Sequence, residues 1–401
     1  MKNYKHIRSV CDRNSEFSTP VIDDFLIYFA ADQHKLARQF DKRLATYRHI
    51  TRDLPKEWLN RFKAQYIAHQ IFKKEGLIRK YINHSGLQHF SKQEMEFLQF
   101  QKEHPWQFSF SQITGRPETD FFDMYDVFTD QEYLFFSPGI TDILQTQHPL
   151  LWFNLISFNG ECWQSYGPIL HFLAFEPQDI LFFAREVYDD WFGTGEEVME
   201  GVEENPLPFS MLLSGSNSPV IFHDEHQIVI NFSEYEINED YNSELFRNDF
   251  FIEYSRGVYK LSPKGWNEFP HFSAAFYKEE DQLLALSSMT DAGYRYLVDL
   301  LNRLGYTLEY EPDDRVNLAM KATASDILKE ELSLNPYEKL FTIDTPPEEQ
   351  EDLGQMNAML AELIPYVNSG EKPDFDALAA KYDVDPEMAK ELYGKARKMV
   401  E

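Results

Sequence analysis

The chain has little cysteine, no long apolar run and a shortage of positive charge. Only Cys11 and Cys162 occur among its 401 residues, too few for a disulfide framework or a cysteine zinc site. The longest apolar stretches, such as 150–153 and 181–184, are strand-sized, whereas a membrane-spanning helix needs about 20 apolar residues. Residues 1–17 lack the apolar centre of a secretory signal. These absences predict a soluble, cytoplasmic protein whose thiols are packed or lie at the surface.

The charge balance is strongly acidic. Lysine and arginine number 38 and aspartate and glutamate 67, a net charge of −29, which opposes binding of nucleic acid or anionic lipid by the molecule as a whole. Hydrophobic residues make up 43% and charged residues 26%, which is ordinary globular usage. At about 150 residues per domain the length predicts two or three folded domains, and nothing indicates a membrane partner.

The first 104 residues are predicted to be helical. Trp58, Phe62 and Tyr66 recur at four-residue spacing, and Pro55 suits the beginning of a helix. His104-Pro105 interrupts the pattern, because a residue before proline is disfavoured in the helical region. We therefore assign residues 1–104 to a basic helical region.

Residues 105–192 are predicted to form an aromatic-rich β unit. Short runs of Phe, Tyr, Trp and Ile alternate with turn residues, as in strands. Asn159-Gly160 indicates a tight hairpin turn, because both residues tolerate positive φ angles. Pro177 stands near the start of a helix that would close the unit. The pattern favours a small barrel or a strongly curled sheet.

Residues 207–343 are predicted to form an α+β domain. The preceding segment, 193–206, carries five glutamates and no lysine or arginine, so we interpret it as a solvated connector or a short acidic helix at a domain boundary. A helix with Tyr294 and Leu301 on one face would cover the sheet and end at Gly305. Strands are predicted at 220–222, 228–232, 250–254, 258–261, 283–286 and 307–310.

An acidic, proline-containing linker at 344–349 precedes a small acidic helical unit, 353–401. Leu378-Ala379 lies in a short helix, Asp385-Pro386 suits an N-cap with proline at the first helical position, and Met388 and Leu392 are predicted to face inward. This resembles the helix-turn-helix pattern of transcription regulators. Its groove-facing residues would be Lys390, Lys395, Arg397 and Lys398, but surrounding acidic residues favour a packing or protein-binding pair. The chain as a whole is predicted to be an α+β, multidomain protein.

Positive charge is concentrated near the N-terminus. Residues 1–104 hold 19 basic and 12 acidic residues, and residues 34–80 hold 13 basic against 4 acidic residues. One interpretation is a cationic face that docks a partner, and the other is a set of solvated helix faces or contacts with the protein's own acidic parts. The candidate partner-binding residues are Lys35, Arg38, Lys42, Arg43, Arg48, Arg52, Arg61, Lys63, Lys73, Lys74, Arg79 and Lys80.

No familiar catalytic signature is present, and we expect no cofactor. His223-Asp224-Glu225-His226 supplies potential metal ligands, but it lies between two apolar runs and reads as a polar hairpin turn, so His223 and His226 are weak metal candidates. Cys162 with His171 lacks the flanking residues of a nucleophile and base, and a packed thiol is favoured.

The runs 105–109 (PWQFS) and 126–133 (DVFTDQEY) resemble a segment of uncharacterised bacterial proteins that often carry a Sec-C type cysteine zinc motif. The resemblance, which we place within residues 105–190, implies a compact β unit in a bacterial cytoplasm. The cysteine motif is absent here, so it implies no zinc site and no activity.

These observations lead to a functional hypothesis: a non-enzymatic, cytoplasmic adaptor that uses its basic N-terminal helices to dock another protein or a ribonucleoprotein. Two alternatives stay open. One is a hydrolase or nucleotide-handling enzyme with dispersed site residues, and the other is a nucleic-acid-binding regulator. The hypothesis requires the early lysines and arginines to point outward, unmatched by carboxylates of the same chain.

Overall fold

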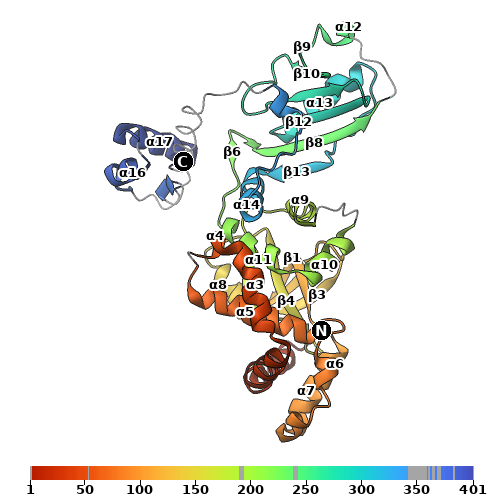
Figure 1. Ribbon diagram of the computed structural model, residues 1–401, viewed down its shortest axis with the longest axis vertical. Helices are drawn as coiled ribbons and strands as arrows, with labels where there is room; N and C mark the ends of the chain where they lie inside the picture. The colour runs from red at the N-terminus through yellow and green to blue at the C-terminus, as the bar shows by residue number, and fades with distance from the viewer. Residues whose placement is uncertain are drawn as a thin grey trace.

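A computed structural model describes residues 2–52, 54–188, 194–237, 243–341, 372–382 and 384–400, with a few positions between 359 and 367. It is α+β and multidomain, as predicted. The N-terminal helices and a closed barrel form the lower part in Figure 1, and a six-stranded sheet forms the upper part. The acidic linker predicted at 344–349 lies outside the described residues.

The prediction of an N-terminal helical region is confirmed. The buried side chains of α3, Leu36 and Phe40, fall on one side of the helix, whereas α5, which begins directly after Pro55, is buried all round from Gln65 to His69. The left-handed Lys35 separates α2 from α3. The elements are α1 (Tyr4–Phe17), the π-helix η1 (Ser18–Ala30), α2 (Ala31–His34), α3 (Leu36–Leu44), η2 (Ala45–Tyr47), α4 (Arg48–Thr51), α5 (Lys56–Phe72), α6 (Ile78–Tyr81), η3 (Ser85–His89) and α7 (Lys92–Glu103).

The aromatic-rich unit is a closed five-stranded barrel of order β1-β2-β3-β5-β4, in which only β3 and β5 pair in parallel. Its elements are β1 (Gln107–Glu118), β2 (Phe121–Asp126), β3 (Glu132–Phe136), α8 (Pro138–Ile143), β4 (Leu151–Phe158) and β5 (Trp163–Phe172). Phe122, Phe135 and Trp152 fill the barrel, while Phe110 and Phe153 belong to the cluster that the outer helices share.

The hairpin predicted at Asn159-Gly160 is confirmed, but its loop has four residues instead of two. The Asn159 carboxamide oxygen accepts hydrogen bonds from the N–H groups of Glu161 and Cys162. This side chain caps its own loop, so the wider turn is favoured over a two-residue one. Gly160 supplies the one left-handed position in this loop, with φ of +98°.

One hydrophobic cluster runs across the boundaries predicted at 104/105 and 192/207. It joins the N-terminal helices, the outer barrel face, and α9 (Pro177–Tyr188), α10 (Gly195–Glu204), α11 (Leu207–Met211), η4 (Leu212–Gly215) and α14 (Leu318–Leu328). The sequence allows two interpretations of the acidic segment that precedes residue 207, a solvated connector or a short acidic helix. The structure shows the helix, α10. Thr194 and Glu197 form its capping box, and Val198 and Val202 are buried on its inner face.

The upper sheet is antiparallel, with the order β13-β8-β12-β11-β10-β9. Helix α13 covers one face, and the segment 334–341, which contains η5 (Glu338–Leu340), packs against the other. The elements are β8 (Val229–Glu236), α12 (Ser243–Phe246), β9 (Phe250–Ser255), β10 (Val258–Pro263), β11 (Ala274–Lys278), β12 (Leu283–Ser288), α13 (Asp291–Arg303) and β13 (Asp314–Asn317), with the small hairpin β6 (Phe222–His223) and β7 (His226–Gln227).

The strand predicted at 307–310 is wrong. The Asn302 side chain accepts a hydrogen bond from the Leu308 N–H and donates one to its carbonyl oxygen, at 2.8 and 3.2 Å. These bonds occupy the backbone groups that a strand would need, and the strand forms later, at β13. The predicted end of α13 at the left-handed Gly305 is confirmed.

The C-terminal pair consists of α16 (Phe375–Tyr382) and α17 (Pro386–Val400). Asp385 accepts a hydrogen bond from the Glu387 N–H, as expected of an N-cap. Met388 was predicted to face inward, but it is 44% exposed, and the buried residues of α17 are Ala389 and Tyr393. Lys390 pairs with Glu387, Arg397 has interaction partners, and the side chains of Lys395 and Lys398 are outside the described set.

A polar network joins the two parts of the molecule. Arg315 of β13 binds both carboxylate oxygens of Asp291 at 3.0 and 3.1 Å and one oxygen of Glu176 at 2.6 Å. Asp179 of α9 accepts hydrogen bonds from the N–H groups of Glu176 and Asn317, both at 2.7 Å. Burial is the main reason that the pKa of Asp179 rises to about 7 from an ordinary value near 3.8. A buried carboxyl group thus stands at the junction of α9 and β13.

We predict that Asp179 makes the free energy of unfolding decrease as pH rises. Its pKa is higher in the folded than in the unfolded chain, so this group's contribution is complete below about pH 4 and is lost as pH rises toward 7. The difference between the folded and unfolded pKa values corresponds to about 4 kcal/mol in the free energy of unfolding. Denaturant unfolding of Asp179→Asn between pH 4 and 8 should show a flatter pH dependence than the wild type. Asp142→Asn, at an exposed carboxylate, is the control; a wild-type slope in Asp179→Asn would contradict the prediction.

Candidate functional site

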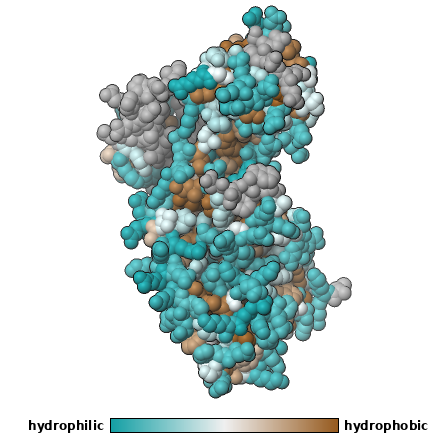
Figure 2. Space-filling view, turned by 45° about the vertical axis from the view of Figure 1, so that its right-hand side comes forward, coloured by the Kyte–Doolittle hydropathy of each residue, from teal (hydrophilic) through white to brown (hydrophobic). Residues whose placement is uncertain are grey.

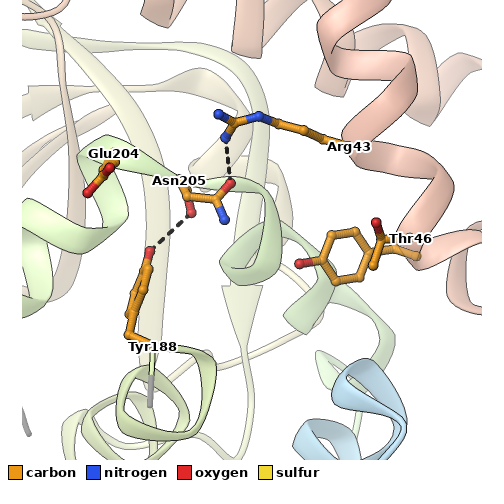
Figure 3. Close-up of a pocket in the computed structure, with 6 residues that line it drawn as sticks. Arg43, Thr46, Tyr188, Glu204 and Asn205 are labelled. Atoms are coloured by element: carbon orange, nitrogen blue, oxygen red, sulfur yellow. Dashed lines mark hydrogen bonds between the residues drawn. The ribbon is translucent and has the colours of Figure 1, made fainter. Parts of the chain in front are cut away.

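A cavity of about 400 Å³ opens where the basic helices meet α9 and α10. Figure 3 shows its lining: Arg43, Thr46 and Tyr47 come from the α3–η2 side, and Tyr188, Glu204 and Asn205 come from α9 and the end of α10. Residues up to 162 positions apart in the sequence therefore share this site. The cavity brings a residue of the predicted cationic set together with groups from the acidic segment.

Two hydrogen-bond systems hold the walls of the cavity. Arg43 donates to the side-chain oxygen of Asn205 at 2.9 Å (Figure 3). The Tyr188 hydroxyl donates to the carbonyl oxygen of Gly201 at 2.6 Å, with a longer contact to that of Asn205. Burial raises the pKa of Tyr188 and of Tyr47, so both phenols stay neutral in the physiological range. The lining therefore combines neutral polar groups with one guanidinium group and the carboxylate of Glu204.

Beside the cavity, Glu203 ties α10 to the core. Its carboxylate contacts the ring Nε2 of the fully buried His69 at 2.5 Å and accepts a hydrogen bond from the Phe108 N–H. Lys73 is half-buried nearby, and burial lowers its pKa, partly opposed by the charges of Glu203 and Glu204. Glu203 therefore stabilises the packing of α10 against the core, whereas the exposed Glu204 faces the cavity.

The cavity offers recognition more readily than catalysis. Its lining combines one cation, one carboxylate, two phenols, a hydroxyl and an amide. Thr46 has no histidine or second carboxylate among the lining residues to activate its hydroxyl. The arrangement suits a polar or anionic group that accepts hydrogen bonds from Arg43 and the hydroxyls.

The predicted partner-binding residues fall into three groups. Arg61, Lys63 and Arg79 form ion pairs with Glu57, Asp41 and Glu75, all within the helical region itself. Arg43 lines the cavity, Lys73 is half-buried within reach of the charges of Glu203 and Glu204, and Arg52 has an interaction partner. Among the residues that the structure describes, six have no carboxylate partner: Lys35, Arg38, Lys42, Arg48, Lys74 and Lys80.

Three of these six, which we call the cationic stripe, stand at the start of α3 and along it: Lys35, the left-handed residue before the helix, and Arg38 and Lys42 within it. Arg38 and Lys42 are four residues apart and so share one side of α3, opposite the buried Leu36 and Phe40. All three are exposed. Arg43 follows Lys42 in the sequence and stands about 100° around the helix from it, at the rim of the cavity.

The metal candidates do not form a site. His223 and His226 pair across the β6–β7 hairpin, with Asp224 at its left-handed turn, so the predicted hairpin is confirmed. Across the described parts of the chain, no three His, Cys, Asp or Glu side chains converge as metal ligands would. His226 instead packs edge-on against the ring of His271, with centroids 5.0 Å apart.

Cys162 and His171 do not form a pair either. Cys162 ends the loop just before β5, whereas His171 lies near the other end of that strand, where its ring contacts the Gln147 side chain at 2.5 Å. Cys162 is buried, as favoured from the sequence, but its neighbour is Cys11, at 3.3 Å. The sequence carried no signal for this contact, because 151 positions separate the two cysteines.

Comparison with known proteins yields no relative: no family model, no curated protein and no solved structure matches this chain. In the described residues, no helix combines the length and the apolar character needed to cross a bilayer. The interpretation of the site therefore depends on its geometry alone.

Glu203 gives a prediction about the wall of the cavity. Glu203→Gln should lower the free energy of unfolding by about 2 kcal/mol, because a buried charge-assisted bond to His69 is weakened and the amide cannot accept equally at both sites. Glu204→Gln, one residue further on, is the matched control and should change it by less than about 0.5 kcal/mol, since its side chain is exposed. Urea unfolding measures both, and equal effects would refute the distinction.

Proposed function

We propose that the protein is a non-enzymatic interaction protein that docks an acidic segment of another protein on the cationic stripe. The single observation that supports it most is the exposure of Lys35, Arg38 and Lys42 without carboxylate partners, in a chain whose net charge is −29. The molecule as a whole is negatively charged, but three exposed cations without carboxylate partners make the electrostatic potential around them positive. Such a field steers a complementary anionic partner to one place.

A protein partner is favoured over a nucleic acid. Tight binding to a phosphate backbone draws on about 6–10 phosphate contacts, whereas the stripe has three cations. The parts of the chain beyond residue 104 carry 55 acidic against 19 basic residues and would repel an extended polyanion. A short acidic segment avoids this repulsion, because it needs only the length of α3.

The cavity gives the segment an end point. A peptide that lies along the stripe and bends around the helix past Lys42 reaches Arg43, an exposed residue at the rim of the cavity. A carboxylate there would take hydrogen bonds from Arg43, while Glu204 on the opposite wall would exclude a second one. The surrounding surface in the lower part of Figure 2 is mainly hydrophilic, as suits a contact that forms and dissociates in water.

The test is charge reversal on the stripe. The triple variant Lys35→Glu, Arg38→Glu, Lys42→Glu should bind a fluorescent glutamate-rich peptide at least about 10-fold more weakly than the wild type, and wild-type binding should weaken between about 50 and 200 mM salt. Fluorescence anisotropy measures both.

The matched control reverses three exposed cations away from the stripe, Lys5, Arg13 and Lys92, and so changes the net charge equally. It should bind nearly as well as the wild type. Equal losses in both triple variants would show that only net charge matters. Tighter binding of an oligouridine RNA of equal charge than of the peptide would replace the proposal with the nucleic-acid alternative.

A further inference from the structure

The chain's two cysteines, 151 positions apart, lie side by side in the fold. Cys11 is in α1 and Cys162 ends the β4–β5 loop, and their sulfur atoms are 3.3 Å apart. Both side chains are buried, with 0% and 1% of their surfaces exposed. A disulfide bond is about 2.05 Å long, so the two sulfurs need to approach by little more than 1 Å to form one.

Asn159 holds this pair in place. Its carboxamide nitrogen points at both sulfurs, at 3.4 Å from Cys11 and 3.6 Å from Cys162. Its oxygen accepts the Glu161 and Cys162 N–H groups, which fixes the amide's direction. Gln164 in turn donates to the backbone carbonyl of Cys11 at 3.2 Å. The loop and the helix are therefore fixed relative to each other around the thiols.

The contact makes the two thiols unequal. The hydrogen bond from Cys162 lowers the pKa of Cys11, with a further lowering by Asn159, against the opposing effect of burial. The same contact raises the pKa of Cys162, so Cys11 is the thiol that ionises first, with Cys162 as its hydrogen-bond donor. A thiolate next to a thiol is the arrangement of an attacking and a resolving cysteine.

We infer that a small oxidant reaches the buried sulfurs when α1 opens locally. The thiols belong to a small cluster, separate from the main core, in which Ile7 of α1 packs on Phe121, Leu134 and Phe136 of the barrel. Polar contacts at the edge of this cluster, such as Arg8 with Asp120, are partly exposed. Because this small cluster and partly exposed polar contacts hold α1 on the barrel, α1 is a unit that can open locally without unfolding the barrel.

We propose that Cys11 and Cys162 form an oxidation site at which a peroxide joins them in a disulfide that fastens α1 to the β4–β5 hairpin. The Cys11 thiolate attacks one peroxide oxygen, the O–O bond breaks, and the departing hydroxide takes up the proton that Cys11 released. Cys162 sulfur then attacks the Cys11 sulfenic acid, its S–O bond breaks, and the Cys162 proton leaves with that oxygen as water. Two thiols and one hydrogen peroxide thus give one disulfide and two waters.

The experiment treats the folded, full-length protein with one equivalent of hydrogen peroxide. Intact mass should fall by two hydrogen atoms, and non-reducing peptide mapping should find the Cys11 peptide joined to the Cys162 peptide. Dithiothreitol should restore the starting mass. The oxidised protein should have a higher Tm and slower hydrogen exchange in residues 4–17, because the cross-link keeps α1 docked.

Single variants identify the order of events. With Cys162→Ser, Cys11 should be trapped by dimedone as a sulfenic acid, whereas with Cys11→Ser the remaining thiol should react at least about 10-fold more slowly. Asn159→Ala, which keeps both thiols, should slow disulfide formation. Unreacted thiols, disulfides between two molecules, or oxygen added to one cysteine in the wild type would each overturn the proposal, and the wild-type measurement stands even if a variant fails to fold.

Discussion

The structure depends on the aromatic outer face of the barrel. A five-stranded barrel has an inside and an outside, and here both are apolar where helices cover the strands. Phe108, Phe110 and Phe153 stack on that outer face, with ring centroids 4.3–5.1 Å apart. They bury surface only if helices from elsewhere in the chain pack on them. Helices before the barrel and helices after it both do so, which brings α3 and α10 together.

The same packing explains why the cations of the N-terminal region face water. Helix α3 has one apolar side, which carries Leu36 and Phe40 and faces the core, where Phe40 packs against Tyr66 of α5. The charged residues are then left on the outer side, since burial of an unpaired charge costs several kcal/mol. Ion pairs form only where a carboxylate is already near on the same surface, as Glu57 is to Arg61. Lys35, Arg38 and Lys42 form the stripe because no carboxylate of the described residues pairs with them.

The sequence revealed local patterns better than contacts between distant segments. Helix spacing around Phe62 and Tyr66 and the turn at Asn159-Gly160 depend on neighbours in the chain, and both predictions are confirmed. The segment 307–310 has strand-like composition, but the Asn302 side chain forms hydrogen bonds with the backbone groups of Leu308. A pattern of apolar residues does not reveal such a contact. Arg43 contacts Asn205, and Cys11 contacts Cys162, because closure of the barrel brings these distant segments together. The local sequence around these residues contains no pattern that indicates the closure.

The two parts of the molecule are joined by contacts of two physical kinds. Val316 and Met320, from β13 and α14, are buried in the lower hydrophobic cluster, so this edge of the sheet cannot leave without exposing apolar surface. Next to them, Arg315, Asp291 and Glu176 make directional ionic contacts. Apolar contacts tolerate small rotations, whereas a guanidinium that binds two carboxylates does so in only one geometry. The apolar contacts therefore hold the sheet on the barrel, and the ionic contacts set its angle.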